Sequence, residues 1–138
     1  MSLLAKAPLP VLSKAVAAFG ELPGFTWLRR PQVGLAMVRA RAGGTGGQFN
    51  LGEMSVTRCA LRLDSGEMGV AYVAGRDARH AEWAALFDAM MQTPAANTVR
   101  DRVLDPIDAV LAARLAETVR QAQATRVDFM TMVRGEDA

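Results

Sequence analysis

The chain has 138 residues, of which 51% are hydrophobic and 22% are charged, and its formal net charge is +2. These values are typical of one soluble globular domain, residues 1–138, whose core needs neither a metal nor a disulfide. The net charge is too small to indicate nucleic acid binding, and a single cysteine excludes an internal disulfide. We read neither a signal-peptide pattern nor a run of roughly 20 apolar residues, so we expect a cytoplasmic protein that binds neither membranes nor nucleic acid.

Helical periodicity first occurs over residues 10–19. Pro10 suits the first turn of a helix, and Gly20 is a suitable stop. The apolar residues between them recur at helical spacing: Val11, Leu12, Ala15, Val16 and Phe19. We therefore expect a helix over Pro10–Phe19, which ends before the break at "LPG".

The next segments predict an antiparallel meander of three strands. Alternation over residues 32–39 indicates the first strand, with Pro31 at its start. After the interruption "AGGTGGQFNLGE", residues 54–63 alternate again, and one face carries Thr57, Cys59, Leu61 and Leu63. The turn "DSG" at 64–66 then leads into the third strand over 67–75.

Two long helices and a closing strand complete the prediction. The first helix runs from Asp77 to about Gln92, and the second begins at "DPID", with Asp105 as its N-cap. The final alternation, "RVDFMTMVR" at 126–134, predicts a strand with apolar residues on both faces, either central in the sheet or docked against another chain. The expected fold class is therefore α+β, an antiparallel sheet of about four strands with three helices packed on it.

The helix that starts at residue 77 has a basic first turn. Asp77 is a good N-cap, yet Arg76, Arg79 and His80, the only histidine, bring cations to the positive end of the helix dipole. Free backbone amides with these side chains would suit a phosphate, a phosphonate or a partner's acidic surface. Alternatively, His80 packs in the interior and Glu82 pairs with Arg79, which makes this an ordinary helix start.

A second group of arginines lies on the predicted sheet. Arg58 and Arg62 share one face of their strand, as Arg39 and Arg41 do on theirs. If those faces adjoin, four guanidinium groups would suit a triphosphate or an acidic partner. The alternative is a solvated sheet face.

The remaining motifs do not form an active site. The segment "GGTGG" at 43–47 has no Lys-Ser/Thr of a P-loop and no following helix, so we interpret it as a wide hairpin loop or a mobile flap. Cys59 lacks a matching set of metal ligands and is expected to be an inert buried thiol. We therefore predict no catalytic residue and no metal site in this chain.

Three stretches together resemble one family: "GGTGGQFNLGEMSVTRCALRL", "GRDARHAEWAALFDAMMQ" and "RVDFMTMVRGEDA". They are similar to the G subunit of the bacterial carbon–phosphorus lyase system for phosphonate breakdown, over roughly residues 30–137. The motif positions that carry over are Arg76, Asp77, His80, Glu82, Arg126, Asp128, Arg134 and Gly135.

The resemblance implies a role in a multisubunit core complex. That complex is an α-D-ribose 1-methylphosphonate 5-triphosphate synthase, in which an alkylphosphonate displaces adenine from ATP. The nucleosidase chemistry belongs to the I type subunit, so the G type subunit is expected to be accessory and inactive alone, with no cofactor of its own and ATP as a substrate of the complex. The other core subunits, chiefly the I type subunit, are the expected partners, and the chain alone is expected to be able to form a homodimer.

The resemblance also gives the C-terminal segment a role. We expect it to serve assembly, and its candidate residues are Arg126, Phe129, Met130, Met132 and Arg134. The alternative function is a stand-alone small domain that binds a phosphate or phosphonate ester through the helix start and through Arg58 and Arg62.

Overall fold

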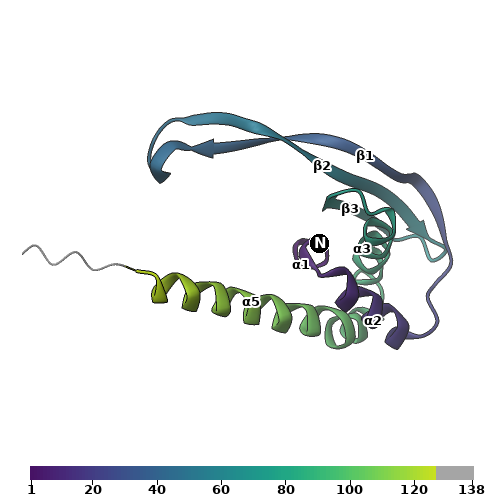
Figure 1. Ribbon diagram of the computed structural model, residues 1–138. Coiled ribbons are helices and arrows are strands. Elements are labelled where there is room, and N and C mark those ends of the chain that lie inside the picture. Colours follow the sequence, from purple (N-terminus) through teal and green to yellow (C-terminus); the bar gives the residue numbers. More distant parts are fainter. Residues whose placement is uncertain (127–138) are drawn as a thin grey trace, which may run out of the picture.

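The structure, a computed structural model, describes residues 1–126 and has an α+β fold. A three-stranded antiparallel sheet lies above a group of helices (Figure 1). In chain order the helices and strands are α1 Ser2–Lys6, α2 Leu9–Phe19, β1 Phe25–Arg41, β2 Gln48–Leu63, β3 Met68–Ala74, α3 Ala78–Met90, α4 Ala96–Val99 and α5 Asp105–Ala124. A 3-10 turn at Ala42–Gly44 follows β1, and a π-helical turn at Arg100–Leu104 joins α4 to α5.

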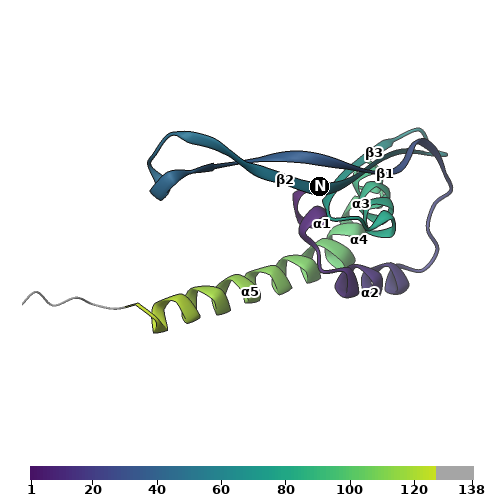
Figure 2. The same cartoon turned by 45° about the horizontal axis from the view of Figure 1, so that its top comes forward.

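The strands follow the order β1-β2-β3 and differ greatly in length. β1 and β2 have 17 and 16 residues, whereas β3 has seven and pairs only with the stretch of β2 from Val56 to Arg62. The β1–β2 hairpin therefore continues past the third strand, from the pair Leu35–Ser55 to the pair Arg41–Gln48. We call this two-stranded part, residues 35–55, the arm; it projects away from the rest of the molecule (Figures 1 and 2).

The hydrophobic core lies between the sheet and α3. One face of β2 carries four buried side chains at alternate positions: Thr57, Cys59, Leu61 and Leu63. Phe87 of α3 is fully buried in this core and meets the ring of Phe19 from α2 edge to face, with the centroids 5.7 Å apart. We call this side of the sheet the inner face and the opposite side, which carries Arg58 and Arg62, the outer face.

The helix α5 leaves the core in the same direction as the arm. Its first turns are anchored by Ile107, which is fully buried, and Leu111 packs partly against the core. Leu115, one turn later, is 65% exposed, so the second half of the helix is outside the core. None of the helices within residues 1–126 is both long and apolar enough to cross a membrane.

Most predicted elements are confirmed. The helices expected at 10–19 and 77–92 correspond to α2 and α3, and the three-stranded meander, its buried face and the turn at 64–66 are present. The glycine segment at 43–47 does connect the two strands of a hairpin. Two short helices, α1 and α4, were not expected.

Three predicted boundaries were wrong. β1 begins at Phe25, so Pro31 lies inside the strand, where the pairing with β2 is irregular between Arg29 and Gln32. The interruption predicted after the first strand is shorter, because β2 already starts at Gln48. Asp105 is the first residue of α5, whose N-cap is Leu104, because the chain enters α5 from a preceding helical turn.

The predicted fourth strand, 126–134, lies outside the described residues except for Arg126, which follows α5 directly. Within residues 1–126 the sheet has three strands, and the expected sheet of about four strands with three helices is approximately right.

Candidate functional site

The start of α3 is organised by Asp77. Its carboxylate accepts a hydrogen bond from the backbone amide of His80, with Oδ1 and N 2.9 Å apart, as the predicted N-cap requires. The cap satisfies one of the free amides of the first turn and places a negative charge at the positive end of the helix dipole. The sequence prediction for Asp77 is confirmed.

The imidazole of His80 points into the protein. The residue is only 8% exposed, and its Nε2 lies 2.7 Å from the carbonyl oxygen of Leu4. A carbonyl can only accept, so Nε2 carries the proton and donates it to this bond. His80 thereby joins α3 to α1 across 76 positions of sequence. This geometry matches the interior packing that the sequence left open as an alternative.

The two arginines of the helix start diverge from His80. Arg76 is exposed, and its Nε donates to the hydroxyl oxygen of Ser55 on β2, 3.4 Å away. Arg79 places its guanidinium 6.0 Å from the ring centroid of Trp83, an exposed cation–π contact. Neither arginine lines the cavity on the outer face of the sheet or the cavity between α2 and the end of α3.

A basic hollow lies on the outer face of the sheet, a cavity of about 300 Å³. Its lining residues are Leu28, Arg29, Arg58, Cys59, Ala60, Val70 and Tyr72. Arg29 pairs with Ala60 across the strands, and Arg58 with Tyr72, so the small Ala60 leaves space between two guanidinium groups and a phenol. No carboxylate contributes to this lining, so the charge of the two arginines favours an anion in the hollow.

The arginines predicted to act together are distributed over two regions. Arg62 lies on the same outer face as Arg58, and its guanidinium donates to the Sδ atom of Met68, 3.6 Å away. Arg39 and Arg41 pair with Asn50 and Gln48 near the tip of the arm, far from Arg58. The four guanidinium groups therefore do not share one surface.

Arg29 lines the basic hollow but was not among the anion-binding residues predicted from the sequence. It lies in the segment "LRRP", directly before the pairing irregularity at Pro31. Which side a residue faces there depends on the irregularity, so alternation alone could not place it. The signal that was available is the pair of adjacent arginines beside a strand proline.

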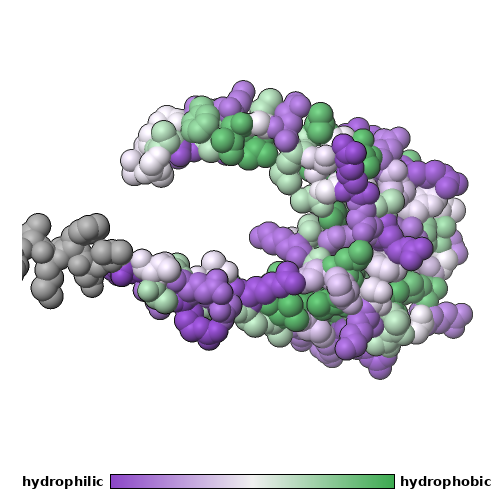
Figure 3. Space-filling view, viewed as in Figure 1, coloured by the Kyte–Doolittle hydropathy of each residue, from purple (hydrophilic) through white to green (hydrophobic). Residues whose placement is uncertain are grey.

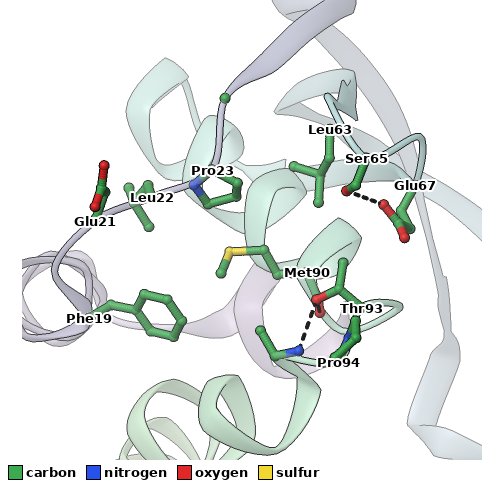
Figure 4. Close-up of a pocket in the computed structure, with 12 residues that line it drawn as sticks. Phe19, Glu21, Leu22, Pro23, Leu63, Ser65, Glu67, Met90, Thr93 and Pro94 are labelled. Atoms are coloured by element: carbon green, nitrogen blue, oxygen red, sulfur yellow. Dashed lines mark hydrogen bonds between the residues drawn. The ribbon is translucent and has the colours of Figure 1, made fainter.

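A larger cavity of about 570 Å³ lies where the end of α2, the β2–β3 turn and the end of α3 meet. Its lining is mainly apolar (Figure 4). Phe19, Leu63 and Met90 point toward its centre, while Glu21 and Glu67 lie at its edge. The hydroxyl of Ser65 donates to the carboxylate of Glu67, and this bond lowers the pKa of Glu67. With two carboxylates at its edge, the cavity does not suit a phosphate or a phosphonate.

Cys59 is buried, and its thiol is hydrogen-bonded. Its thiol donates to the carbonyl oxygen of Ala81, with Sγ and O 3.1 Å apart. Burial, with a smaller contribution from the charge of Glu82, raises the pKa of Cys59 to about 11. At neutral pH the sulfur is a protonated thiol, which is neither a nucleophile nor a metal ligand.

The described residues do not assemble a catalytic set. Among residues 1–126, no group of three or more His, Cys, Asp or Glu side chains is placed to hold a metal ion. The assembly candidates Phe129, Met130, Met132 and Arg134 lie outside the described residues. This part of the chain has a hollow lined by two arginines and no carboxylate, and it has exposed apolar surfaces.

Comparisons with known proteins place the chain in a family. The model of the family described as "Phosphonate metabolism protein PhnG" matches residues 1–135. The chain is also 43% identical over 137 residues to the α-D-ribose 1-methylphosphonate 5-triphosphate synthase subunit PhnG of Rhizobium meliloti (strain 1021), an alignment that covers 99% of this chain and 88% of the relative. The chain therefore belongs to the PhnG family of phosphonate metabolism proteins.

Proposed function

We propose that this chain is an accessory subunit of an α-D-ribose 1-methylphosphonate 5-triphosphate synthase. The observation that carries the proposal is the similarity over nearly the whole length of both chains to a relative with that name. The site geometry supports an accessory role, because residues 1–126 contain no metal-ligand cluster and the lining of their basic hollow contains no His, Asp, Glu or Lys.

In this proposal the chemistry belongs to the complex. A phosphonate oxygen forms a bond to the anomeric carbon of the ATP ribose, and the bond from that carbon to adenine breaks. Adenine leaves, and the triphosphate is retained in the product. The chief partner is the nucleosidase-type I subunit, which would supply the catalytic groups, and this chain would stabilise that subunit in its active arrangement. ATP is a substrate of the complex, and this chain alone needs no cofactor.

Reconstitution tests the proposal. Adenine release from ATP with methylphosphonate is measured in the mixture of synthase subunits, with this chain present or omitted. We expect release to depend on the chain and the chain alone to release no adenine. Equal release without the chain would overturn the subunit assignment.

The basic hollow favours a second candidate function, in which the chain itself binds a phosphate or phosphonate ester. Arg29 and Arg58 flank the hollow without a carboxylate in the lining, and Arg62 adds charge on the same face. Titration calorimetry of the isolated chain with ATP and with methylphosphonate tests this, with Arg58→Ala as the test variant. Arg39→Ala, near the tip of the arm, is the matched control. Binding by the wild-type chain that is lost only in Arg58→Ala would support direct ligand binding.

A further inference from the structure

The inner face of the sheet continues beyond the helix that covers it. At the edge of the core, this face carries the buried Thr57 on β2 and, opposite it on β1, Val33, which is already 51% exposed. The alternation is regular from there into the arm, so Leu35 and Met37 are the next β1 side chains on the inner face. They are 64% and 53% exposed, because no helix packs under the arm in residues 1–126.

The helix α5 repeats this pattern. Ile107 is fully buried and Leu111 is partly buried, and at the same four-residue spacing Leu115 is 65% exposed. Val119, one turn further, is also among the exposed large hydrophobic residues. Exposed apolar side chains therefore occur beyond the anchored turns, along residues 112–124, which we call the helix extension.

Both apolar surfaces face the same open space. The core lies between the sheet and the helices, so the inner face of the arm is directed toward the side of the molecule on which α5 lies (Figure 1). In the space-filling view the molecule is C-shaped, with an open cleft between the arm and the helix extension (Figure 3). Apolar residues on both sides of an open cleft are typical of a protein-binding surface.

The arm also needs a partner for its own stability. A two-stranded hairpin without a third strand or a packed helix is marginal in water. The outer edge of β1 adds a further row of unpaired backbone groups within the described sheet, since the strand order is β1-β2-β3. A partner surface that fills the cleft would pack against the inner face of the arm and so stabilise the hairpin.

The net charge of the two elements that border the cleft argues against a symmetric pair of this chain. The arm and the helix extension together carry four arginines, Arg39, Arg41, Arg114 and Arg120, against two glutamates, Glu53 and Glu117. Two copies joined cleft to cleft would bring like charges together, whereas a different protein with carboxylates around an apolar ridge would be complementary.

We propose that the cleft binds another subunit of the synthase and that this partner inserts an apolar ridge bordered by acidic residues. This inference rests on the proposed function, because it names the surface by which the accessory subunit joins the complex. Leu35 and Leu115 are the central contacts on the two sides of the cleft, and they are buried only after assembly.

Titration calorimetry of the full chain into the remaining purified synthase subunits tests this. We expect Leu35→Glu and Leu115→Glu each to weaken binding by at least about tenfold, as truncation of central apolar contacts does. Both residues are exposed in the free chain, so circular dichroism should show that the variants fold normally. The matched control is Met54→Glu on the outer face of the arm, which should bind within about twofold of wild type.

Other outcomes identify other occupants. Wild-type binding by a double Leu35→Glu, Leu115→Glu variant would overturn the proposal. A wild-type homodimer that both substitutions dissociate, while binding to the other subunits is unchanged, would assign the cleft to a second copy. Binding that is lost on removal of residues 127–138 but not in the two variants would assign the contact to that segment instead. If the wild-type chain does not bind the other subunits, the proposed function itself fails.

Discussion

At the scale of single residues, Asp77 and His80 show how a basic helix start can serve the fold. Asp77 caps the helix through the amide of His80, and the imidazole of His80 donates to the carbonyl of Leu4. The first interaction satisfies an amide of the first turn that has no partner within the helix, and the second adds a bond to a carbonyl that also accepts from the amide of Ala7. The position of His80 at the start of α3 therefore has a structural explanation that involves no ligand.

Substitution of the cap should lower stability. Asp77→Ala leaves the amide of His80 without its acceptor and removes a favourable charge, so we expect a loss of about 0.5–2 kcal/mol in the free energy of unfolding. Asp77→Asn retains an acceptor oxygen and should lose less. Urea denaturation followed by circular dichroism measures both, and equal stability of Asp77→Ala and wild type would contradict the cap.

The buried thiol of Cys59 should make stability depend on pH in the alkaline range. Its pKa rises from 9.0 in the unfolded chain to about 11 in the folded one, so the folded state holds the proton more tightly. The resulting contribution is complete below pH 9 and is lost as the pH rises toward 11, by roughly 2–3 kcal/mol.

The variant Cys59→Ala isolates this effect, because other groups titrate in the same range. It should be less stable than wild type at pH 7 because it leaves a small cavity, and the difference should shrink between pH 9 and 11. Denaturant titrations at several pH values give the two curves. Parallel curves across that range would show that the thiol does not titrate as described.

The residue scale also shows what sequence can and cannot predict. The cap of Asp77 was predictable because its partner lies three positions away, and the burial of Cys59 followed from strand alternation. The partner of His80 lies 76 positions away, in a five-residue helix without a clear sequence signal. Arg29 was missed because its side of the sheet depends on an irregularity beside Pro31.

At the scale of elements, the close approach of β3 to α3 depends on one glycine. A Cβ atom at Gly69 would overlap the carbonyl oxygen of Ala85 and lie 2.8 Å from the amide nitrogen of Ala89. Both contacts are backbone atoms of the helix and cannot rotate away. The short distance between strand and helix is therefore possible only without a side chain at this position.

Gly69→Ala should accordingly destabilise the protein, by about 1–3 kcal/mol or more, as overpacked cores do. Gly52→Ala is the matched control, because it lies in β2 with no atom within 4 Å of the added Cβ. Thermal unfolding should show a clear decrease in Tm for Gly69→Ala and little change for Gly52→Ala. A similar Tm for both would mean that the helix can move away from the strand at little cost.

The length of the hairpin was the main feature of the elements that the sequence did not predict. Alternation predicted strands where one face is buried, as at Thr57 and Leu61. In the arm both faces are exposed, so the burial that produces the usual pattern is absent, and "QFNLGE" resembled a loop.

At the scale of the whole molecule, the residues that form the core and the exposed residues that we propose for assembly belong to different parts. The core is formed by the three-stranded part of the sheet, by α1, α2 and α3 and by the first turns of α5. The arm and the helix extension instead carry exposed apolar side chains. Removal of the arm should therefore separate the two properties. A fitting variant replaces residues 38–52 with Asn-Gly, which forms a tight hairpin turn between Met37 and Glu53, paired residues of β1 and β2.

We expect this shortened chain to fold with a free energy of unfolding within about 0.5 kcal/mol of wild type, because the deleted residues contribute no buried side chain. It should nevertheless fail to support adenine release in the reconstituted synthase and fail to co-elute with the other subunits in size-exclusion chromatography. A shortened chain that unfolds at lower denaturant concentration would show that the arm stabilises the core. Full activity would show that assembly depends on the helix extension, on the basic hollow or on residues 127–138, and the arm would then need another explanation for its length.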